Sequence, residues 1–233
     1  MNHFFHNITL KGALPLKATS KSTNLTSLYF FCKFLIMKIL ISFLALCVLG
    51  NNFKNELEFL IIFFSDYENE TILFIQNFIR EKFCKNVIVK NDKLGIKFYN
   101  KKRKQFNASL ILDYIVQKYK SENYSVIITF IDEDCYVEGL NFIFGLADPK
   151  SKACLVATKR YHQSFYNLKE DKKIFLERLR KEITHELGHI FGLSHCTLPD
   201  CVMYFSNSIF DTDKKSENFC ERCRKILDNV LEK

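Results

Sequence analysis

Three histidines and one glutamate near residue 190 have the spacing of a catalytic zinc site. The chain reads His-Glu-Leu-Gly-His-Ile-Phe-Gly-Leu-Ser-His from His185 to His195. Residues four apart lie on one face of a helix, so His185 and His189 can direct their ring nitrogens at one point. Glu186 lies about 100° further around the helix, near such a metal ion without competing for its ligand positions.

Gly192 can end this helix and turn the chain so that a third metal ligand can follow. Glycine readily adopts the positive φ that ends a helix and turns the chain back, which would bring His195 to the metal. Three protein ligands leave the fourth tetrahedral position for water, as in catalytic rather than closed structural zinc sites. The alternative is a surface helix that carries two histidines by chance, and requiring Gly192 and His195 as well makes that coincidence much rarer.

The residues before the motif predict one long helix that carries His185 and His189. Apolar residues fall largely on one helical stripe, as expected for a helix packed on a core. Asn167, with Glu170 three residues later, has the spacing of a capping box. We therefore expect a helix over about 168–191. Its apolar stripe consists of Ile174, Phe175, Leu176, Leu179, Ile183, Leu187, Ile190 and Phe191.

Nine cysteines occur in the chain, and four of them form two closely spaced pairs. Cys196-x4-Cys201 and Cys220-x2-Cys223 have the arrangement of a structural zinc site with four thiolate ligands. Two disulfides are the alternative, but a Cys-x-x-Cys disulfide is usually redox-active and no other cysteine pair indicates an oxidised framework. The others lie in apolar sequence and are expected to act as small hydrophobic residues. They are Cys32, Cys47, Cys84, Cys135 and Cys154.

The two predicted metal sites adjoin each other in the chain. The segment after Gly192 is short and has few apolar residues, so it cannot bury enough surface to hold itself in place. A zinc ion bound by the four cysteines would hold it. Because Cys196 directly follows His195, the same ion would also fix the backbone that delivers the third histidine.

The segment from His185 to Met203 resembles a known family of zinc peptidases. It reads His-Glu-x-x-His-x-x-Gly-x3-Cys-x4-Cys-x-Met and is followed by Cys220-x2-Cys223. This pattern is similar to that of the archaemetzincins, a branch of the metzincins. The resemblance covers about residues 57–231. Further segments that resemble the family are residues 105–108, 138–145 and 203–208.

The resemblance implies a role for each residue of the motif. Glu186 would act as general base, and Met203 would be the Met-turn residue beneath the catalytic metal. Two zinc ions per chain are implied, one catalytic and one structural. The implied activity is peptide-bond hydrolysis, with aminopeptidase-like action on short peptides. The ligands would be His185, His189 and His195 for the catalytic zinc, and Cys196, Cys201, Cys220 and Cys223 for the structural zinc.

Residues 57–233 are long enough to form one domain with a sizeable core. Strand and helix patterns alternate along them, which predicts helices packed on a mixed sheet. The expected fold class is α+β, with a twisted mixed sheet flanked by helices, a zinc-binding active-site helix and a small zinc-stapled C-terminal subdomain. The resemblance likewise implies a zincin-like, metzincin-like fold. We expect strands at 58–64, 86–89, 125–131 and 153–158, and further helices at 68–83, 107–119 and 218–231.

Residues 1–56 form a leader of different character. Residues 28–49 are mainly apolar and long enough to span a bilayer, although Lys33 and Lys38 interrupt them. A start at Met37 would instead make a short signal sequence, and a start further downstream would remove the leader altogether. Thiolate zinc ligands favour the reducing cytoplasm, where we expect the protein. Membrane anchoring or export through residues 28–49 is the alternative.

The predicted function is zinc-dependent hydrolysis of peptide or protein substrates by a monomer. A non-catalytic zinc module that binds a protein partner or nucleic acid is the alternative, but such a module has no need of Glu186. The formal net charge of +8 lies mainly in the leader. The basic cluster at 101–104 lacks the interleaved aromatic residues of a base-stacking surface, so nucleic-acid binding is not expected.

Overall fold

The computed structural model describes residues 57–83 and 86–231, and its main element is a five-stranded sheet. The strands are β1 (Glu58–Phe63), β2 (Asn86–Asn91), β5 (Val126–Ile131), β7 (Gly145–Asp148) and β8 (Ala153–Ala157). Their order is β2-β1-β5-β8-β7. All neighbours run parallel except β7, an edge strand that pairs antiparallel with β8. The predicted mixed sheet is thus confirmed.

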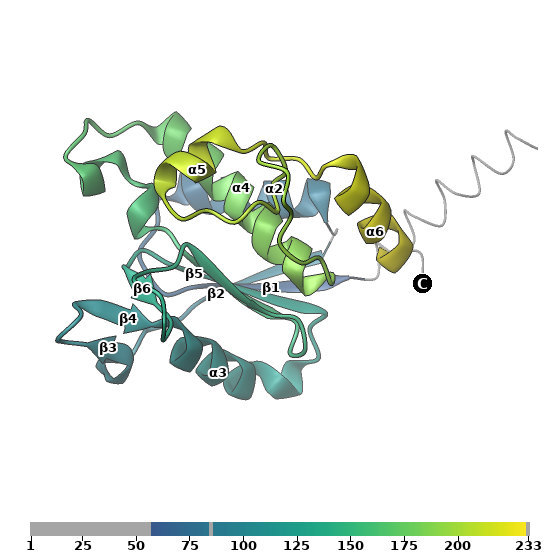
Figure 1. Cartoon of the computed structure of the whole chain (residues 1–233). Coiled ribbons are helices and arrows are strands. Elements are labelled where there is room, and N and C mark those ends of the chain that lie inside the picture. The colour runs from purple at the N-terminus through teal and green to yellow at the C-terminus, as the bar shows by residue number, and fades with distance from the viewer. Residues whose placement is uncertain (1–56, 84–85, 232–233) are drawn as a thin grey trace, which may run out of the picture. The chain divides into compact units, whose positions relative to one another are not determined.

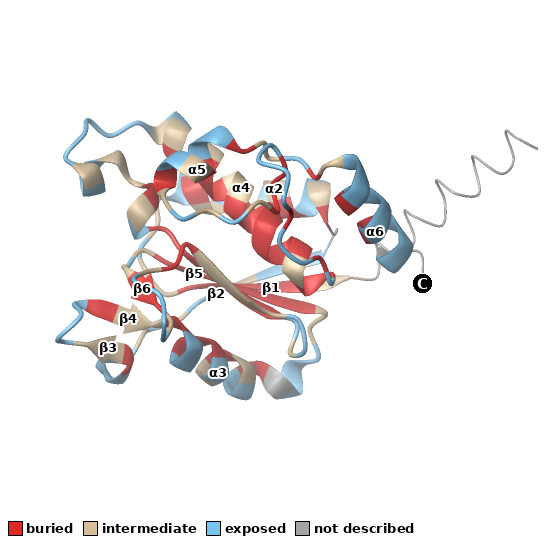
Figure 2. Ribbon diagram, viewed as in Figure 1, coloured by how far each residue is buried: buried red, intermediate tan, exposed pale blue. Residues whose placement is uncertain are grey.

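Helices cover both faces of this sheet (Figure 1). α2 (Asn69–Lys82) and α4 (Lys172–Ile190) lie on one face, and α3 (Ala108–Tyr119) lies on the other. Figure 2 shows that buried residues follow the strands and the sheet-facing sides of these helices. The sheet is therefore a layer between two hydrophobic cores, which explains why its inner strands are apolar along their whole length.

β1 illustrates how one strand serves both cores. Successive side chains of a strand point to opposite faces of the sheet. Phe59, Ile61 and Phe63 belong to the core under α2 and α4, whereas Leu60 and Ile62 belong to the core under α3. Since no side of β1 meets water, the near-continuous apolar sequence follows from its position.

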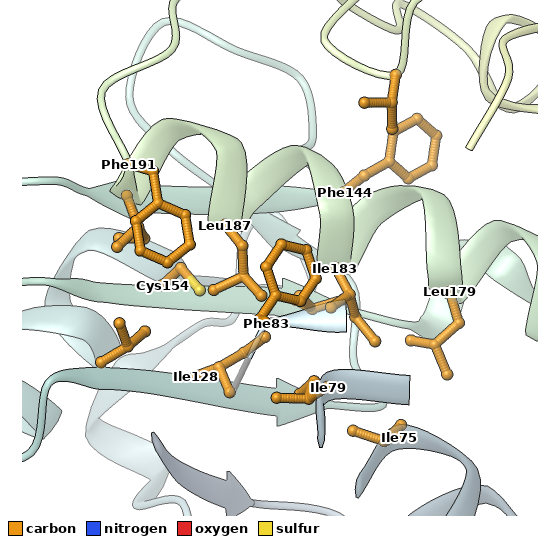
Figure 3. Close-up of a cluster of buried hydrophobic side chains, with 14 of the residues drawn as sticks. Ile75, Ile79, Phe83, Ile128, Phe144, Cys154, Leu179, Ile183, Leu187 and Phe191 are labelled. Atoms are coloured by element: carbon orange, nitrogen blue, oxygen red, sulfur yellow. The ribbon is translucent and has the colours of Figure 1, made fainter. Parts of the chain in front are cut away.

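The apolar stripe of α4 packs on the sheet and sets the rotation of that helix (Figure 3). Leu179, Ile183 and Leu187 are fully buried and lie over β5 and β8, where Ile128 and Cys154 contribute to the same core. A helix anchored along one stripe cannot turn about its axis. The side of α4 that carries His185 and His189 is therefore held against the segment that follows the helix.

A small second sheet and two further helices complete the described part of the chain. The sheet has the order β3-β4-β6, with β4 antiparallel to β3 and parallel to β6. These strands are β3 (Tyr99–Asn100), β4 (Gln105–Asn107) and β6 (Cys135–Tyr136). After α4 come α5 (Ile209–Lys214) and α6 (Glu221–Leu231), which belong to the predicted C-terminal subdomain.

The predicted strands and helices are confirmed apart from a few residues at their ends, with one correction and five short strands or α-helices that were not predicted. α4 begins at Lys172, because the Asp171 carboxylate accepts hydrogen bonds from the backbone N–H groups of Lys173 and Ile174. Asn167 does not cap this helix: its φ of 58° ends a preceding 3-10 turn. The short elements that were not predicted have no apolar periodicity of their own. They are the strands β3, β4, β6 and β7 and the helix α5.

The leader, with residues 28–49, lies outside the described residues, so the expectations about it stay predictions. The same holds for Cys32, Cys47 and Cys84. Cys135 and Cys154 are buried and free, as predicted for small hydrophobic cysteines. Within 57–83 and 86–231, no helix is both long and apolar enough to cross a membrane.

Candidate functional site

His185 and His189 lie on one side of α4, with their Nε2 atoms facing each other. Nδ1 of His185 is 2.8 Å from the carbonyl oxygen of Val202, and Nδ1 of His189 is 2.7 Å from that of Leu193. A carbonyl oxygen can only accept, so each Nδ1 carries the hydrogen and donates. Each Nε2 therefore has a free lone pair, and burial lowers the pKa of both imidazoles, which keeps them neutral.

The two Nε2 atoms are 3.2 Å apart. Two lone pairs that face each other at this distance repel unless a cation lies between them. Zinc bound at about 2.0–2.1 Å to each nitrogen would separate two tetrahedral ligands by about 3.3 Å. His195 completes the group, since the nearest ligand atoms of the three histidines all lie within 4.8 Å of one another. The donor set thus fits a zinc ion.

Gly192 makes the turn that brings His195 to this group. Its φ is +91°, a conformation that side chains disfavour. The backbone N–H groups of Gly192 and Leu193 donate back to the carbonyls of His189 and Gly188, which ends the helix. The ring of His195 then packs edge-on against Phe205, with ring centroids 4.9 Å apart.

Glu186 lies in the same cavity as the three histidines and is 3% exposed. A methyl group added at Gly145 of β7 would lie 2.6 Å from Cδ of Glu186, so the carboxylate packs directly on the backbone of the edge strand. Burial, and then the neighbouring carboxylate of Glu182, raise the pKa of Glu186. A carboxylate with a raised pKa in this place is suited to accept and return a proton.

Met203 is fully buried beneath α4. A methyl group at Gly188 would lie 3.2 Å from Cε of Met203 and closer still to its sulfur. Met203 therefore supports the helix at the level of Gly188, directly before His189, and only glycine leaves room for it. The Met-turn role that the resemblance implies for Met203 stays a prediction.

The four C-terminal cysteines form a second group, separate from the histidines. Their sulfur atoms lie within 4.8 Å of one another, and those of Cys196 and Cys220 are 3.8 Å apart. A disulfide needs about 2.05 Å, whereas two thiolates on one tetrahedral zinc are separated by about 3.8 Å. All four cysteines are free, as in a thiolate site rather than a pair of disulfides.

Hydrogen bonds to sulfur support this second group. The backbone N–H of Cys220 donates to the sulfur of Cys201 at 3.3 Å, and the Arg222 guanidinium donates to that of Cys196 at 3.5 Å. Burial raises the pKa of Cys201 and of Cys223, whereas a hydrogen bond from the backbone of Cys223 is the main cause that lowers the pKa of Cys220 to about 7. A thiol with this pKa is readily deprotonated for metal binding.

The cavity above the histidines has a volume of about 470 Å³. One wall is the edge strand β7 with the preceding residues 140–144, and the other is the segment that follows Met203. The outer rim is pinned by Arg103, which donates to the carbonyls of Leu140 and Asn141 and stacks on the ring of Tyr136. Arg103, which belongs to the basic cluster at 101–104, thus stabilises the rim of the cavity.

Several residues of this cavity were given no role from the sequence, among them Glu182, Gly145, Phe205 and Lys215. Glu182 could have been found, because it precedes Glu186 by four residues and so shares its helix face. Gly145 and Phe205 belong to segments that resemble the family, but their place in the cavity, like that of Lys215, depends on how β7 and the C-terminal segment fold around α4.

Comparison with known proteins gives consistent matches. Peptidase family M54 matches residues 42–229. An archaemetzincin from Nanoarchaeum equitans is 37% identical over 171 residues, which are 73% of this chain and 91% of that protein. One from Pyrococcus horikoshii is 40% identical over 168 residues, 70% of this chain and 89% of that protein.

Solved structures show the same relationship. The crystal structure of archaemetzincin from Methanopyrus kandleri has a TM-score of 0.65 and 35% identity, covering 76% of this chain and 96% of that chain. That from Archaeoglobus fulgidus, complexed with malonate, has a TM-score of 0.62 and 30% identity, covering 73% and 99%.

Fold, cavity and relatives together define a zinc metallopeptidase of the metzincin type, which acts on peptides or proteins. The chain belongs to the archaemetzincins, peptidase family M54. The family, fold and enzyme class predicted from the sequence are confirmed.

Proposed function

We propose that the chain hydrolyses peptide bonds at a zinc ion held by His185, His189 and His195, with Glu186 as general base. The observation that carries this proposal is the buried carboxylate of Glu186 in the same cavity as three converging imidazoles. A zinc ion held there would supply a Lewis acid that polarises the scissile carbonyl and makes water a better nucleophile. Glu186 would accept the proton of that water and return it to the leaving amine.

Edge strand β7 supports a mode of substrate binding. Among the described residues its one partner strand is β8, so the backbone groups on its other side can pair with an extended peptide. Gly145 and its neighbours line the cavity, and Glu186 packs on Gly145. A peptide added along β7 would therefore pass directly over the general base and the three imidazoles.

We further propose that Cys196, Cys201, Cys220 and Cys223 hold a second, structural zinc ion. A site closed by four protein ligands leaves no position for water or substrate. Its effect would be to order the segment between α4 and α6. The aminopeptidase-like preference implied by the resemblance remains part of this proposal, together with a monomeric state.

Glu186→Gln tests the central role. The amide keeps the shape of the side chain but cannot accept the proton, so we expect zinc content to be unchanged and cleavage of a peptide library to fall by about a thousandfold or more. Zinc is counted by elemental analysis in the wild type and the variant, side by side. Undiminished cleavage by Glu186→Gln would remove the assignment of the general base.

A further inference from the structure

Lys215 is a buried cation in the reaction cavity that the proposed hydrolysis does not use. It follows α5 directly, is 2% exposed and lines the cavity together with Glu182, Glu186 and the histidines. Lys215 therefore shares one cavity with the three histidines of the proposed metal centre.

The ammonium group of Lys215 has few partners in the protein. Its Nζ donates to the carbonyl oxygen of Tyr204 at 3.2 Å, and this is its one hydrogen bond within the described ranges. No carboxylate oxygen of residues 57–83 or 86–231 lies within 4.0 Å of it. An ammonium has three N–H donors, so two remain for another acceptor. Burying a charge without a partner is costly, which points to a partner that comes from outside.

A second unpartnered group lies in the wall of the same cavity. The hydroxyl oxygen of Ser206 is buried and has no hydrogen-bond partner in the described part of the chain. Ser206 and Lys215 both line the cavity. Buried polar atoms are nearly always hydrogen-bonded in folded proteins. One ligand that accepts from both the ammonium and the hydroxyl would satisfy both groups.

Hydrogen bonds between α4 and α5 fix the position of Lys215. The guanidinium of Arg178 on α4 makes two hydrogen bonds of 2.7 Å to the carboxylate of Asp213 on α5. The ammonium of Lys181 donates to the backbone carbonyls of Thr212 and Asp213 at 2.9 and 2.8 Å. α5 is therefore tied to the helix that carries the histidines, and Lys215 is held in a fixed position relative to them.

Two carboxylates line the same cavity as Lys215. Burial is the main cause that lowers the pKa of Lys215, and the carboxylates of Glu182 and Glu186 oppose that shift. Neither carboxylate forms an ion pair with Lys215, so both leave the donors of its side chain free.

From these contacts we propose that Lys215 and Ser206 form a subsite for a carboxylate group of the peptide substrate. The inference rests on the proposed function, because it assigns a substrate class to the same cavity. The carboxylate belongs to an Asp or Glu side chain next to the scissile bond or to the C-terminus of a short peptide. Both sources offer the same oxygen acceptors, and a charge-assisted hydrogen bond to an ammonium is stronger than a neutral one.

Paired peptides and matched variants test the subsite. Lys215→Met keeps the length of the side chain and removes its charge, and Lys214→Met makes the same change at an exposed neighbour. One peptide pair differs by Asp against Asn with an amidated C-terminus, and the other has a free against an amidated C-terminus with no acidic side chain. Binding of labelled peptides to the zinc-loaded protein is measured by fluorescence anisotropy, and cleavage is measured in parallel.

We expect the wild type and Lys214→Met to bind one carboxylate-bearing peptide at least about tenfold more tightly than its neutral partner. Lys215→Met should lose that preference while binding the neutral peptide as before. Ser206→Ala should reduce the preference by a smaller factor, and it provides the test if Lys215→Met does not fold. The pair that shows the preference identifies the source of the carboxylate.

Two results would overturn the subsite. One is a wild type without preference in either pair, and the other is an equal loss for acidic and neutral peptides in both Lys215→Met and Ser206→Ala. Equal losses would mean that Lys215 only supports the backbone at Tyr204. A carboxylate preference in binding without any cleavage would uphold the subsite and contradict the proposed hydrolysis, so the two failures are distinguishable.

Discussion

Gly145 of the edge strand β7 packs directly on Glu186, the proposed general base. The carboxylate of Glu186 occupies the space in which any other residue at position 145 would place its Cβ. Glu186 is also buried on its other sides, so it has little room to move away. The position of the Glu186 carboxylate thus depends on the absence of a Cβ atom at Gly145.

Gly145→Ala should therefore impair catalysis without removing the metal. The added methyl group would displace the Glu186 carboxylate by about 1 Å, and a displacement of that size costs about a hundredfold in rate. We expect kcat to fall by this order while zinc content stays at the wild-type value.

Gly95→Ala is the matched control, since a methyl group there makes only ordinary contacts, of 3.7 Å or more. Its activity should equal that of the wild type. Wild-type turnover by Gly145→Ala would show that Glu186 tolerates the displacement.

Among the contacts between elements, His162 ties the segment between β8 and α4 to the residue that follows β5. Nε2 of His162 is 3.2 Å from an Asp132 carboxylate oxygen, and Nδ1 is 2.8 Å from one of Glu170. Its ring packs on Phe175 of α4, with centroids 4.5 Å apart. Because both ring nitrogens face carboxylates, both are donors in the protonated form, and the hydrogen bond to Asp132 is the main cause that raises the pKa of His162.

This contact predicts a pH-dependent stability. A pKa that is higher in the folded than in the unfolded state contributes stability below about pH 6.5, and the contribution is lost as the pH rises through the folded-state pKa. Urea unfolding of the wild type and His162→Gln should show a larger difference in unfolding free energy at about pH 6 than at about pH 8.5. A difference that grows toward high pH would contradict the protonated bridge.

At the scale of the whole described chain, the histidine and cysteine groups share one stretch of backbone. The carbonyl of Val202 accepts from His185, and the backbone N–H of Cys196 donates to the carbonyl of Met203 at 2.9 Å. Cys201 precedes Val202 and its sulfur accepts from the backbone of Cys220. The cysteine group thus supports the residues that orient a histidine of α4, as well as the peptide bond that leads to His195.

Loss of one cysteine should therefore weaken the distant histidine site. In Cys223→Ser we expect zinc content to fall from the proposed two ions per chain to below about one, with loss of peptide cleavage, because the proposed structural zinc would order the segment between α4 and α6. Elemental analysis after dialysis measures both sites together.

Cys135→Ala serves as the control, since Cys135 is buried in the core under α3 and belongs to neither group. It should retain both ions. A Cys223→Ser protein that keeps one zinc and full activity would show that the two sites are independent.

The residue pattern alone was enough to predict zinc-dependent hydrolysis and to place its candidate residues on one helix and the turn after it. Ligand spacing of three to four residues is a property of one helix, so His185 and His189 could be assigned before any fold was known. The apolar strands and the stripe of α4 followed from the same local periodicity. Gly192 and the cysteine spacings likewise indicated a turn and a four-sulfur group, because both depend on neighbours close in the chain.

The residues that join the site from distant parts of the chain could be found only in the folded protein. Gly145 meets Glu186 across 41 positions, and Lys215 reaches the cavity from beyond α5, so no periodicity connects them to the motif. Such contacts arise when separate elements pack on a shared core, and that packing depends on the shape and volume of many side chains at once. For the same reason, the proposed carboxylate subsite becomes visible only in the folded chain.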